Sequence, residues 1–267
     1  MKRIWTGILT LPPLVFLIAV GPSEVLVLLV LVATFFGLRE FYNLALPHSK
    51  PIERGVGMVL GLFLPVLVSC GEMKWIPLFF VFSLLVLSVL YMVTSRNLSS
   101  TISSIGMSLF GVLYIGFLLS YILLIRKGVD GKEWVFFLIA TVWAGDLSAY
   151  LVGTAFGRRK LYPKISPNKT FEGLGGAMVG SVIMALAFSA LFLPSLGRWG
   201  VIFLGLGLGL FGQIGDFIES MLKRSAQVKD SGSLIPGHGG MLDRLDSLLF
   251  TAPFLHYALV YLFKESP

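Results

Sequence analysis

The residue types best suited to chemistry lie between Asp216 and Asp246, in the stretch DFIESMLKRSAQVKDSGSLIPGHGGMLDRLD. It combines carboxylates, basic residues, a histidine and several glycines. Apolar runs at 199–221 and 245–263 overlap its two ends, and each is long enough to cross a bilayer core, which takes about 20 residues. A connector between membrane helices needs only to be short and polar. This stretch therefore carries more chemistry than a connector requires.

The carboxylates of this stretch are suited to a hard cation. Asp216, Ser220 and Lys223 fall at i, i+4 and i+7, so they share one helical face. Asp243 and Asp246 share a face at the start of the last apolar run, where carboxylates also favour a helix N-terminus. Mg²⁺ typically binds one or two protein carboxylates together with substrate phosphates and water. We therefore expect Asp216, Asp243 and Asp246 to lie near Mg²⁺, and the number of cations stays open.

Asp146 lies well inside the apolar run 134–156. A carboxylate at that depth costs about 2.5–3.5 kcal/mol on insertion scales, so we expect it to face a cavity, a cation or a partner. The alternative is a structural hydrogen bond to a neighbouring hydroxyl group.

Other acidic residues of the apolar runs have simpler explanations. Glu219 is four residues before Lys223, which predicts an ordinary ion pair along one helix. Glu24 and Glu40 lie at the ends of apolar runs, where we expect their carboxylates to reach water. We interpret these two as parts of the scaffold.

The connection 157–172 is the second polar stretch of interest, because it is dense in basic residues: Arg158, Arg159, Lys160, Lys164 and Lys169. A solvated loop on the inner face of a membrane would explain the charges alone. It would not explain SPNKTFEG, in which Pro167 and Asn168 favour a turn and Thr170 precedes a new helix. A rigid turn that presents Lys164 and Lys169 beside a helix N-terminus would form a phosphate cradle.

The glycines of LIPGHGGMLDRLD allow the backbone to approach a ligand closely, and their amides can point at anionic oxygens: Gly237, Gly239 and Gly240. The G-x-x-x-x-G-K-[ST] pattern of a P-loop does not occur in the sequence. The three histidines are too scattered for a zinc triad, and a single cysteine, Cys70, excludes an internal disulfide. Of the histidines, only His238 lies among polar motif residues.

The composition places these residues in a membrane protein. The chain has 267 residues, of which 56% are hydrophobic and 13% charged, whereas soluble domains carry about 25% charged residues. The net charge of +7 could indicate nucleic acid, but the basic residues lie between apolar runs and suit anionic headgroups or a phosphate-bearing substrate better. We therefore expect no nucleic-acid partner.

Apolar runs define about nine transmembrane helices: 4–20, 24–46, 55–70, 75–94, 103–125, 134–156, 173–193, 199–221 and 245–263. They lack the period-two alternation of a barrel, so the predicted fold is an all-α polytopic integral membrane protein. The first run has no small-residue cleavage site, and we expect it to be a retained span. Without linkers, residues 1–267 are expected to form one integral domain, with 1–130 mainly as scaffold and 131–267 carrying the chemistry.

The distribution of Lys and Arg predicts the orientation. An N-terminus in the cytoplasm places most of the 21 basic residues on the inner side and the C-terminus outside. The connections 157–172 and 222–244 then lie on the same cytoplasmic face. The glycine-rich spans would suit a homodimer or close packing within one chain equally well.

The motifs resemble those of the phosphatidate cytidylyltransferase family. The run S-x-x-K-R-x(4)-K-D-x-G-x-x-I-P-G-H-G-G-x-x-D-R-x-D, from Ser220 to Asp246, is similar to the signature of that family. ISPNKTFEG (165–173) is similar to a second block, and Asp146 with Tyr150 to a third. The resemblance covers the last half of the chain in family order. It departs at Asn168, where a basic residue is expected, which leaves the number of phosphate contacts open.

The resemblance implies that CTP and phosphatidic acid react to give CDP-diacylglycerol and pyrophosphate at the cytoplasmic side of the plasma membrane, with Mg²⁺. It implies catalytic roles for Asp216, Asp243, Lys164 and Lys169. Further contacts to substrate are then expected from Asp146, Arg158, Ser166, Glu172, Ser220, Lys223, Arg224, Lys229, Gly237, His238, Gly239, Gly240 and Arg244. His238 could equally be structural.

Three other functions are compatible with parts of the pattern. A CTP-dependent polyprenol kinase would also use CTP and Mg²⁺, but it would transfer the γ-phosphoryl group. A CDP-alcohol phosphotransferase should show D-x-x-D-G, and here Ser247 follows Asp246. An ion-coupled transporter could use Asp146 and Asp216 in a permeation path.

Overall fold

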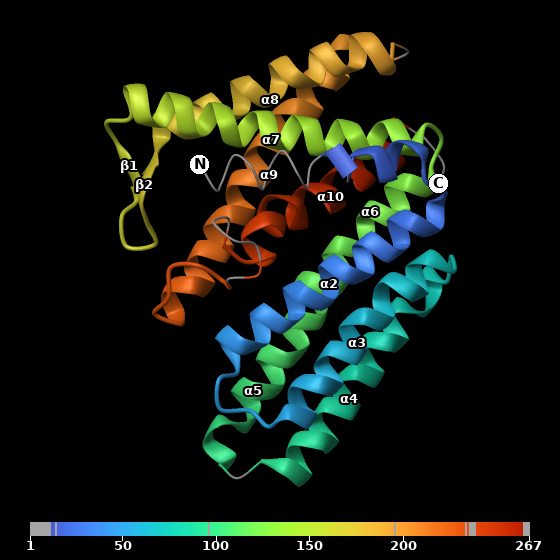
Figure 1. The fold of residues 1–267 in the computed structure, drawn as a ribbon, viewed down its shortest axis with the longest axis vertical. Coiled ribbons are helices and arrows are strands. Elements are labelled where there is room, and N and C mark those ends of the chain that lie inside the picture. The colour runs from blue at the N-terminus through green and yellow to red at the C-terminus, as the bar shows by residue number, and fades with distance from the viewer. Residues whose placement is uncertain are drawn as a thin grey trace. The chain divides into compact units, whose positions relative to one another are not determined.

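The structure is a computed structural model, and it describes residues 12–13, 15–95, 97–194, 196–232, 234 and 239–263. Its elements, in chain order (Figure 1), are α2 (Ser23–Ala45), α3 (Pro51–Ser69), the 3₁₀-helix η1 (Met73–Trp75), α4 (Ile76–Thr94), α5 (Leu98–Gly111), the π-helix η2 (Val112–Phe117), α6 (Leu118–Lys127), α7 (Gly131–Phe156), β1 (Lys160–Tyr162), β2 (Ser166–Thr170), α8 (Phe171–Phe192), α9 (Arg198–Ser225) and α10 (Leu242–Leu262).

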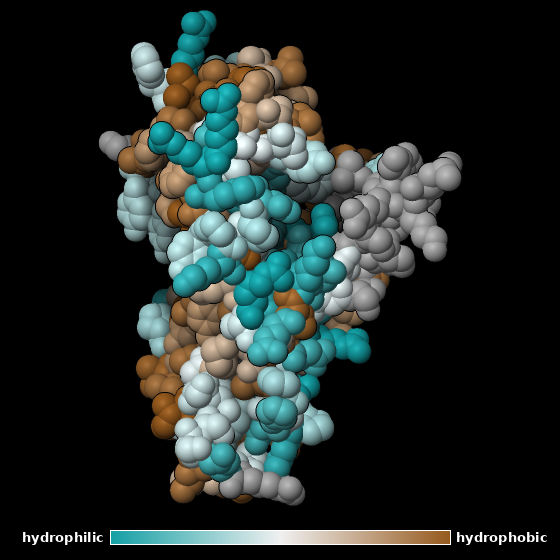
Figure 2. Space-filling model, turned by 90° about the vertical axis from the view of Figure 1, so that its left-hand side faces the viewer, coloured by the Kyte–Doolittle hydropathy of each residue, from teal (hydrophilic) through white to brown (hydrophobic). Residues whose placement is uncertain are grey.

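The predicted all-α membrane architecture is confirmed. In the described part of the chain, eight helices are long and apolar enough to cross a membrane, and they coincide with the second to ninth predicted spans. The first predicted span, 4–20, falls largely outside the described residues. Many large apolar side chains of these helices are exposed, as expected where lipid replaces water, and the brown patches in Figure 2 show apolar residues on one face.

The chain divides into two compact units by its internal contacts. The first contains residues 1–123 and 230–245, and the second contains residues 124–229 and 246–267. The single integral domain expected from the sequence stays a prediction.

The first unit is built on α2, α3, α4 and the long helix that α5, η2 and α6 form together. In Figure 1, α2, α3, α4 and α5 lie side by side, and buried apolar residues such as Leu64, Leu87 and Val112 form their core. α3 crosses η2 closely, since a Cβ on Gly116 would lie 2.5 Å from the carbonyl oxygen of Gly61. Small residues allow this kind of approach between membrane helices.

In the second unit α8 packs between α7 and α9. The glycine-rich run of α9 was expected to mark close packing, and Gly205 and Gly209 indeed lie against the backbone of α8, at Val182 and Met178. These glycines therefore pack within the chain.

A short antiparallel hairpin, β1–β2, joins α7 to α8 (Figure 1). The sequence predicted a turn here and no strands. Outside the membrane an extended segment can satisfy its backbone by pairing, and Lys160 pairs with Thr170 while Tyr162 pairs with Ser166. Thr170 then begins α8, because its Oγ1 accepts a hydrogen bond of 3.0 Å from the Gly173 amide.

Candidate active site

An acidic cluster lies where α9 and α10 meet in the second unit. One carboxylate oxygen from each of Asp216, Glu219 and Asp246 lies within 4.8 Å of the other two. The two helices approach closely here because Gly215 has no side chain: a Cβ on it would lie 2.2 Å from the carbonyl oxygen of Asp246. Converging carboxylate oxygens are donors that a hard divalent cation prefers, so this cluster fits such an ion.

Two lysines are paired with this acidic cluster. Lys169 of β2 lies 2.6 Å from Asp216 Oδ2, and its ammonium group is 4.3 Å from the centre of the Phe217 ring. Lys223 forms an ion pair with Glu219, which is fully buried. The predicted pair of Glu219 and Lys223 is confirmed, but Glu219 also belongs to the cluster.

Asp146 of α7 is held by side chains from the neighbouring helices. Its Oδ1 accepts a hydrogen bond of 3.0 Å from Gln213 Nε2 of α9, and its Oδ2 accepts one of 3.1 Å from Ser247 Oγ of α10. Ser220 Oγ donates a hydrogen bond of 3.3 Å to Asp216 Oδ1, as their shared helical face predicts. The carboxylates thus have defined orientations before any ligand binds.

A cavity of about 550 Å³ adjoins these residues in the second unit. Asp146, Gln213, Asp216 and Lys169 line it, so it brings together an acidic wall and a basic group. The inner side of the hairpin and the first turn of α8 complete the lining, through residues such as Lys160, Thr170 and Gly173. Asp146 therefore faces a cavity as expected, and it also makes the hydrogen bond to a hydroxyl that was the alternative.

The sequence predicted that Lys164 and Lys169 form one phosphate cradle, but in the structure the hairpin separates them. Lys169 reaches Asp216, whereas Lys164 lies exposed in the turn between the strands. The turn is tied to the end of α9, because Arg224 Nε donates a hydrogen bond of 3.3 Å to the carbonyl of Ile165. Ser166 is half-buried in β2 and pairs with Tyr162.

Glu172 fixes the start of the hairpin. Its carboxylate accepts hydrogen bonds from the backbone amides of Arg158 and Arg159, at distances of 3.1 to 3.3 Å. The side chain of Arg158 is exposed, and so is that of Lys229 beyond the end of α9.

Asp243 belongs to the first unit, and its carboxylate contacts the loop before α10. Its Oδ2 accepts hydrogen bonds from the Ser231 amide (3.0 Å) and the Gly240 amide (2.8 Å). It also lies 2.9 Å from the Ser231 hydroxyl, whose one proton can be donated either to Asp243 or to Glu40. In the described structure, Asp243 and Gly240 therefore help to hold the loop before α10 in place. Gly239 has a positive φ of 81°, and Arg244 is exposed. Gly237 and His238 lie outside the described residues.

Glu40 does not reach water, and that expectation was wrong: it is 8% exposed. Its carboxylate accepts hydrogen bonds of 2.9 Å from the Met241 and Leu242 amides, and its Oε2 lies 2.9 Å from the Ser231 hydroxyl. The start of α10 leaves these amides without a partner inside the helix, and Glu40 supplies one. A side chain on Gly240 would clash with it, since a Cβ would lie 2.3 Å from Glu40 Oε2.

Sequence reasoning missed three residues of the site. Gln213 and Ser247 were not singled out, and Glu219 was interpreted only as half of an ion pair. A signal was available for the first two, because an amide or hydroxyl close to an aspartate within a membrane run needs a hydrogen-bond partner. No local signal marked Glu219.

The sequence matches known proteins over nearly its whole length. Residues 1–262 match the cytidylyltransferase family. The chain is 36% identical over 263 residues to the phosphatidate cytidylyltransferase of Bacillus subtilis (strain 168), a match that covers 97% of each chain. It is 32% identical over 239 residues to that of Staphylococcus saprophyticus (88% of this chain, 90% of the other). It is 33% identical over 262 residues to that of Staphylococcus aureus (strain COL), covering 97% and 98%.

Proposed function

The chain belongs to the cytidylyltransferase family, and we propose that it catalyses the reaction of CTP with phosphatidic acid to give CDP-diacylglycerol and pyrophosphate. Its relatives named phosphatidate cytidylyltransferase cover nearly the whole chain. The observation that carries the proposal is the acidic cluster of Asp216, Glu219 and Asp246 beside Lys169, at a cavity of about 550 Å³. Carboxylates for a cation beside a lysine for phosphate are the groups that nucleotidyl transfer needs.

We propose that Asp216, Asp246 and Glu219 hold Mg²⁺. When bound, the ion would neutralise phosphate charge and stabilise the charge that develops on the leaving pyrophosphate. The metal-binding role expected for Asp243 stays a prediction, for which the contacts of its carboxylate to Ser231 and Gly240 offer no direct support.

The reaction forms a bond between a phosphate oxygen of phosphatidic acid and the α-phosphorus of CTP. The bond from that phosphorus to the bridging oxygen breaks, and its electron pair leaves with pyrophosphate. Both reactants are anions and repel each other, so fixed positive charge lowers the barrier. Phosphatidic acid is already ionised near neutral pH, so no residue needs to remove a proton.

We propose the following division of labour among the side chains of the second unit. Lys169 contacts the phosphate that enters the cavity, and Asp146, fixed by Gln213 and Ser247, helps to orient the ligand. The more exposed cations extend the phosphate contacts: Lys164, Arg158, Arg224 and Lys229. Ser220, Lys223, Ser166 and Glu172 hold these groups in place.

For the loop before α10 we keep the proposal drawn from the sequence. The backbone of residues 237–240 would contact the triphosphate, with His238 and Arg244 close by. We further propose that the protein lies in the plasma membrane with the site facing the cytoplasm, as the charge distribution indicates.

The test is an assay of the purified full-length protein in detergent micelles with CTP and phosphatidic acid. We expect pyrophosphate and CDP-diacylglycerol in equal amounts with Mg²⁺, and neither after chelation with EDTA. The dependence of the rate on Mg²⁺ concentration reports whether one cation or two are required. Release of CDP with a polyprenol, and no reaction with phosphatidic acid, would overturn the proposal in favour of a kinase.

A further inference from the structure

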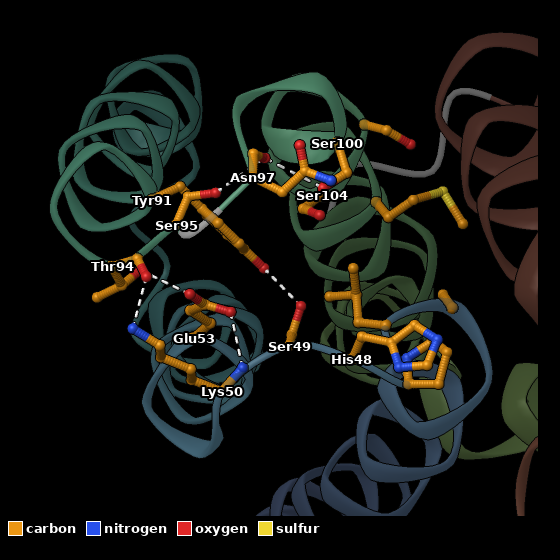
Figure 3. Close-up of a pocket in the computed structure, with 15 residues that line it drawn as sticks. His48, Ser49, Lys50, Glu53, Tyr91, Thr94, Ser95, Asn97, Ser100 and Ser104 are labelled. Carbon is orange, nitrogen blue, oxygen red and sulfur yellow. Dashed lines mark hydrogen bonds between the residues drawn. The ribbon is translucent and has the colours of Figure 1, made fainter.

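A second pocket, of about 730 Å³, lies in the first unit. The end of α2, the start of α3, the end of α4 and the start of α5 surround it (Figure 3). Most of its lining is polar, with serines at 49, 95, 100, 103 and 104, although the chain as a whole is 56% hydrophobic. Of the described residues given a role in catalysis, none lines this pocket.

Among the described residues that line this pocket, Glu53 is the one carboxylate, and it is hydrogen-bonded to other residues of the protein. Glu53 is 4% exposed, and it accepts hydrogen bonds of 2.8 Å from the Lys50 amide and 2.6 Å from Thr94 Oγ1, as Figure 3 shows. Both oxygens of this carboxylate therefore point into the wall. Neither oxygen is directed at a ligand in the pocket.

The groups that remain available are mostly hydrogen-bond donors. The Lys50 ammonium group donates one of its three N–H groups to the Thr94 carbonyl, at 2.5 Å. Ser103, Ser104 and the His48 ring make no hydrogen bond within the described residues. A lysine and free hydroxyls that line one pocket are suited to an anionic oxygen group, and phosphate is the common one at a membrane surface.

The surface beside the pocket is apolar. Met92 and Val93 at the end of α4 are 72% and 75% exposed, and Leu98 and Ile102 at the start of α5 are 82% and 79% exposed. Both helices belong to candidate membrane spans, and the pocket lies at their ends, where lipid headgroups are expected. A free phosphate ion would make no contact with this apolar border, whereas the acyl chains of a lipid would cover it.

We propose that this pocket binds the phosphate of an anionic phospholipid headgroup, with the acyl chains lying against Met92, Val93, Leu98 and Ile102. Lys50 and the hydroxyls of Ser103 and Ser104 contact the phosphate. The site lies in the first unit and does not depend on the function proposed above. It gives the protein a means to respond to the anionic lipid content of its own membrane.

The test measures how fast a cysteine in the pocket reacts. A Ser100→Cys variant of the full chain is reconstituted in nanodiscs and treated with neutral N-ethylmaleimide, and labelling is followed peptide by peptide. The native Cys70 is exposed at the other end of α3 and serves as the internal reference. Exchanging phosphatidylcholine for 30 mol% phosphatidylglycerol should slow labelling of the introduced thiol relative to that of Cys70 by about fivefold, which corresponds to a site four-fifths occupied.

Two further changes in this background identify the cause of the protection. Lys50→Gln, and separately Ser103→Ala with Ser104→Ala, should remove the protection, while Lys74→Gln in the connection before α4 should leave it unchanged. The double serine variant loses no hydrogen bond that the described structure contains, so its fold is expected to persist even if Lys50→Gln unfolds. Equal rates in the two lipids would overturn the proposal. So would the same protection by inorganic phosphate in phosphatidylcholine discs, because the site would then bind free phosphate.

Discussion

At the scale of single residues, the acidic cluster is a source of electrostatic repulsion in the folded protein. Asp216, Glu219 and Asp246 gather three carboxylates within 4.8 Å of one another, and only part of their charge is balanced by Lys169 and Lys223. Like charges this close raise the free energy of the folded state. Such a cost persists where function requires it.

Asp246→Asn should therefore stabilise the protein while it destroys activity. In buffer without divalent cations, relief of repulsion should raise Tm by about 2–4 °C for each kcal/mol gained. Loss of a cation ligand should lower kcat by at least about 100-fold. Thermal unfolding and the phosphatidate assay measure the two effects. A variant with normal activity would remove Asp246 from the site, and Glu72→Gln, at an exposed ion pair, serves as the control.

Lys169 and Lys164 differ in position, so they should differ in effect. Lys169→Met should lower kcat/KM by about 100-fold, because its ammonium group lies at the cavity beside Asp216. Lys164→Met should lower it by less than about 10-fold, because Lys164 is exposed in the hairpin turn. Equal losses in the phosphatidate assay would instead favour the joint cradle that the sequence predicted.

The spacing of residues along the chain was enough to predict some members of the candidate site. Asp216 and Ser220 lie one turn apart, and their hydrogen bond follows from that spacing. The partners of Asp146, by contrast, are 67 and 101 residues away in sequence. The role of Glu219 depends on the contact between α9 and α10, and a local ion pair already explained it. Long-range side-chain contacts of this kind have no periodic signal.

At the scale of elements, the helices were predictable and the hairpin was not. Runs of about 20 apolar residues have one stable form in lipid, so their lengths predicted the spans. The segment 160–170 consists mostly of prolines and of polar or charged residues, and such a segment can satisfy its backbone in water in several ways. Its strands depend on pairing with each other and on anchoring by Glu172 and Arg224.

The start of α10 depends on a carboxylate from α2, which gives an element-scale prediction. Glu40→Ala would leave the Met241 and Leu242 amides and the Ser231 hydroxyl without this acceptor. A hydrogen bond to a charged group contributes about 1.5–3 kcal/mol, so we expect a clear fall in Tm. Circular dichroism melting would measure it. The control is Glu24→Ala on the same helix, where the side chain is exposed and Tm should hardly change. Equal falls in the two variants would contradict the inference.

At the scale of the whole molecule, the proposed orientation assigns a side of the membrane to each connection. Cys70, the one cysteine of the chain, lies between α3 and α4 and should face outward. The hairpin turn should face the cytoplasm. An impermeant maleimide applied to intact cells should therefore label Cys70 and should not label Lys164→Cys in a Cys70→Ser background. Permeabilised cells should show labelling of both. Labelling of the hairpin in intact cells would reverse the topology.

The contact between Lys169 and Asp216 has a consequence for the order in which ligands load. The Lys169 ammonium group lies 2.6 Å from Asp216 Oδ2, so it competes with a divalent cation for this carboxylate. Phosphate groups that draw the lysine away from Asp216 would free this carboxylate for the cation, and the cation would in turn hold the phosphates more firmly. By linkage the two affinities rise by the same factor. Nucleotide and metal are therefore expected to bind cooperatively, and each alone only weakly.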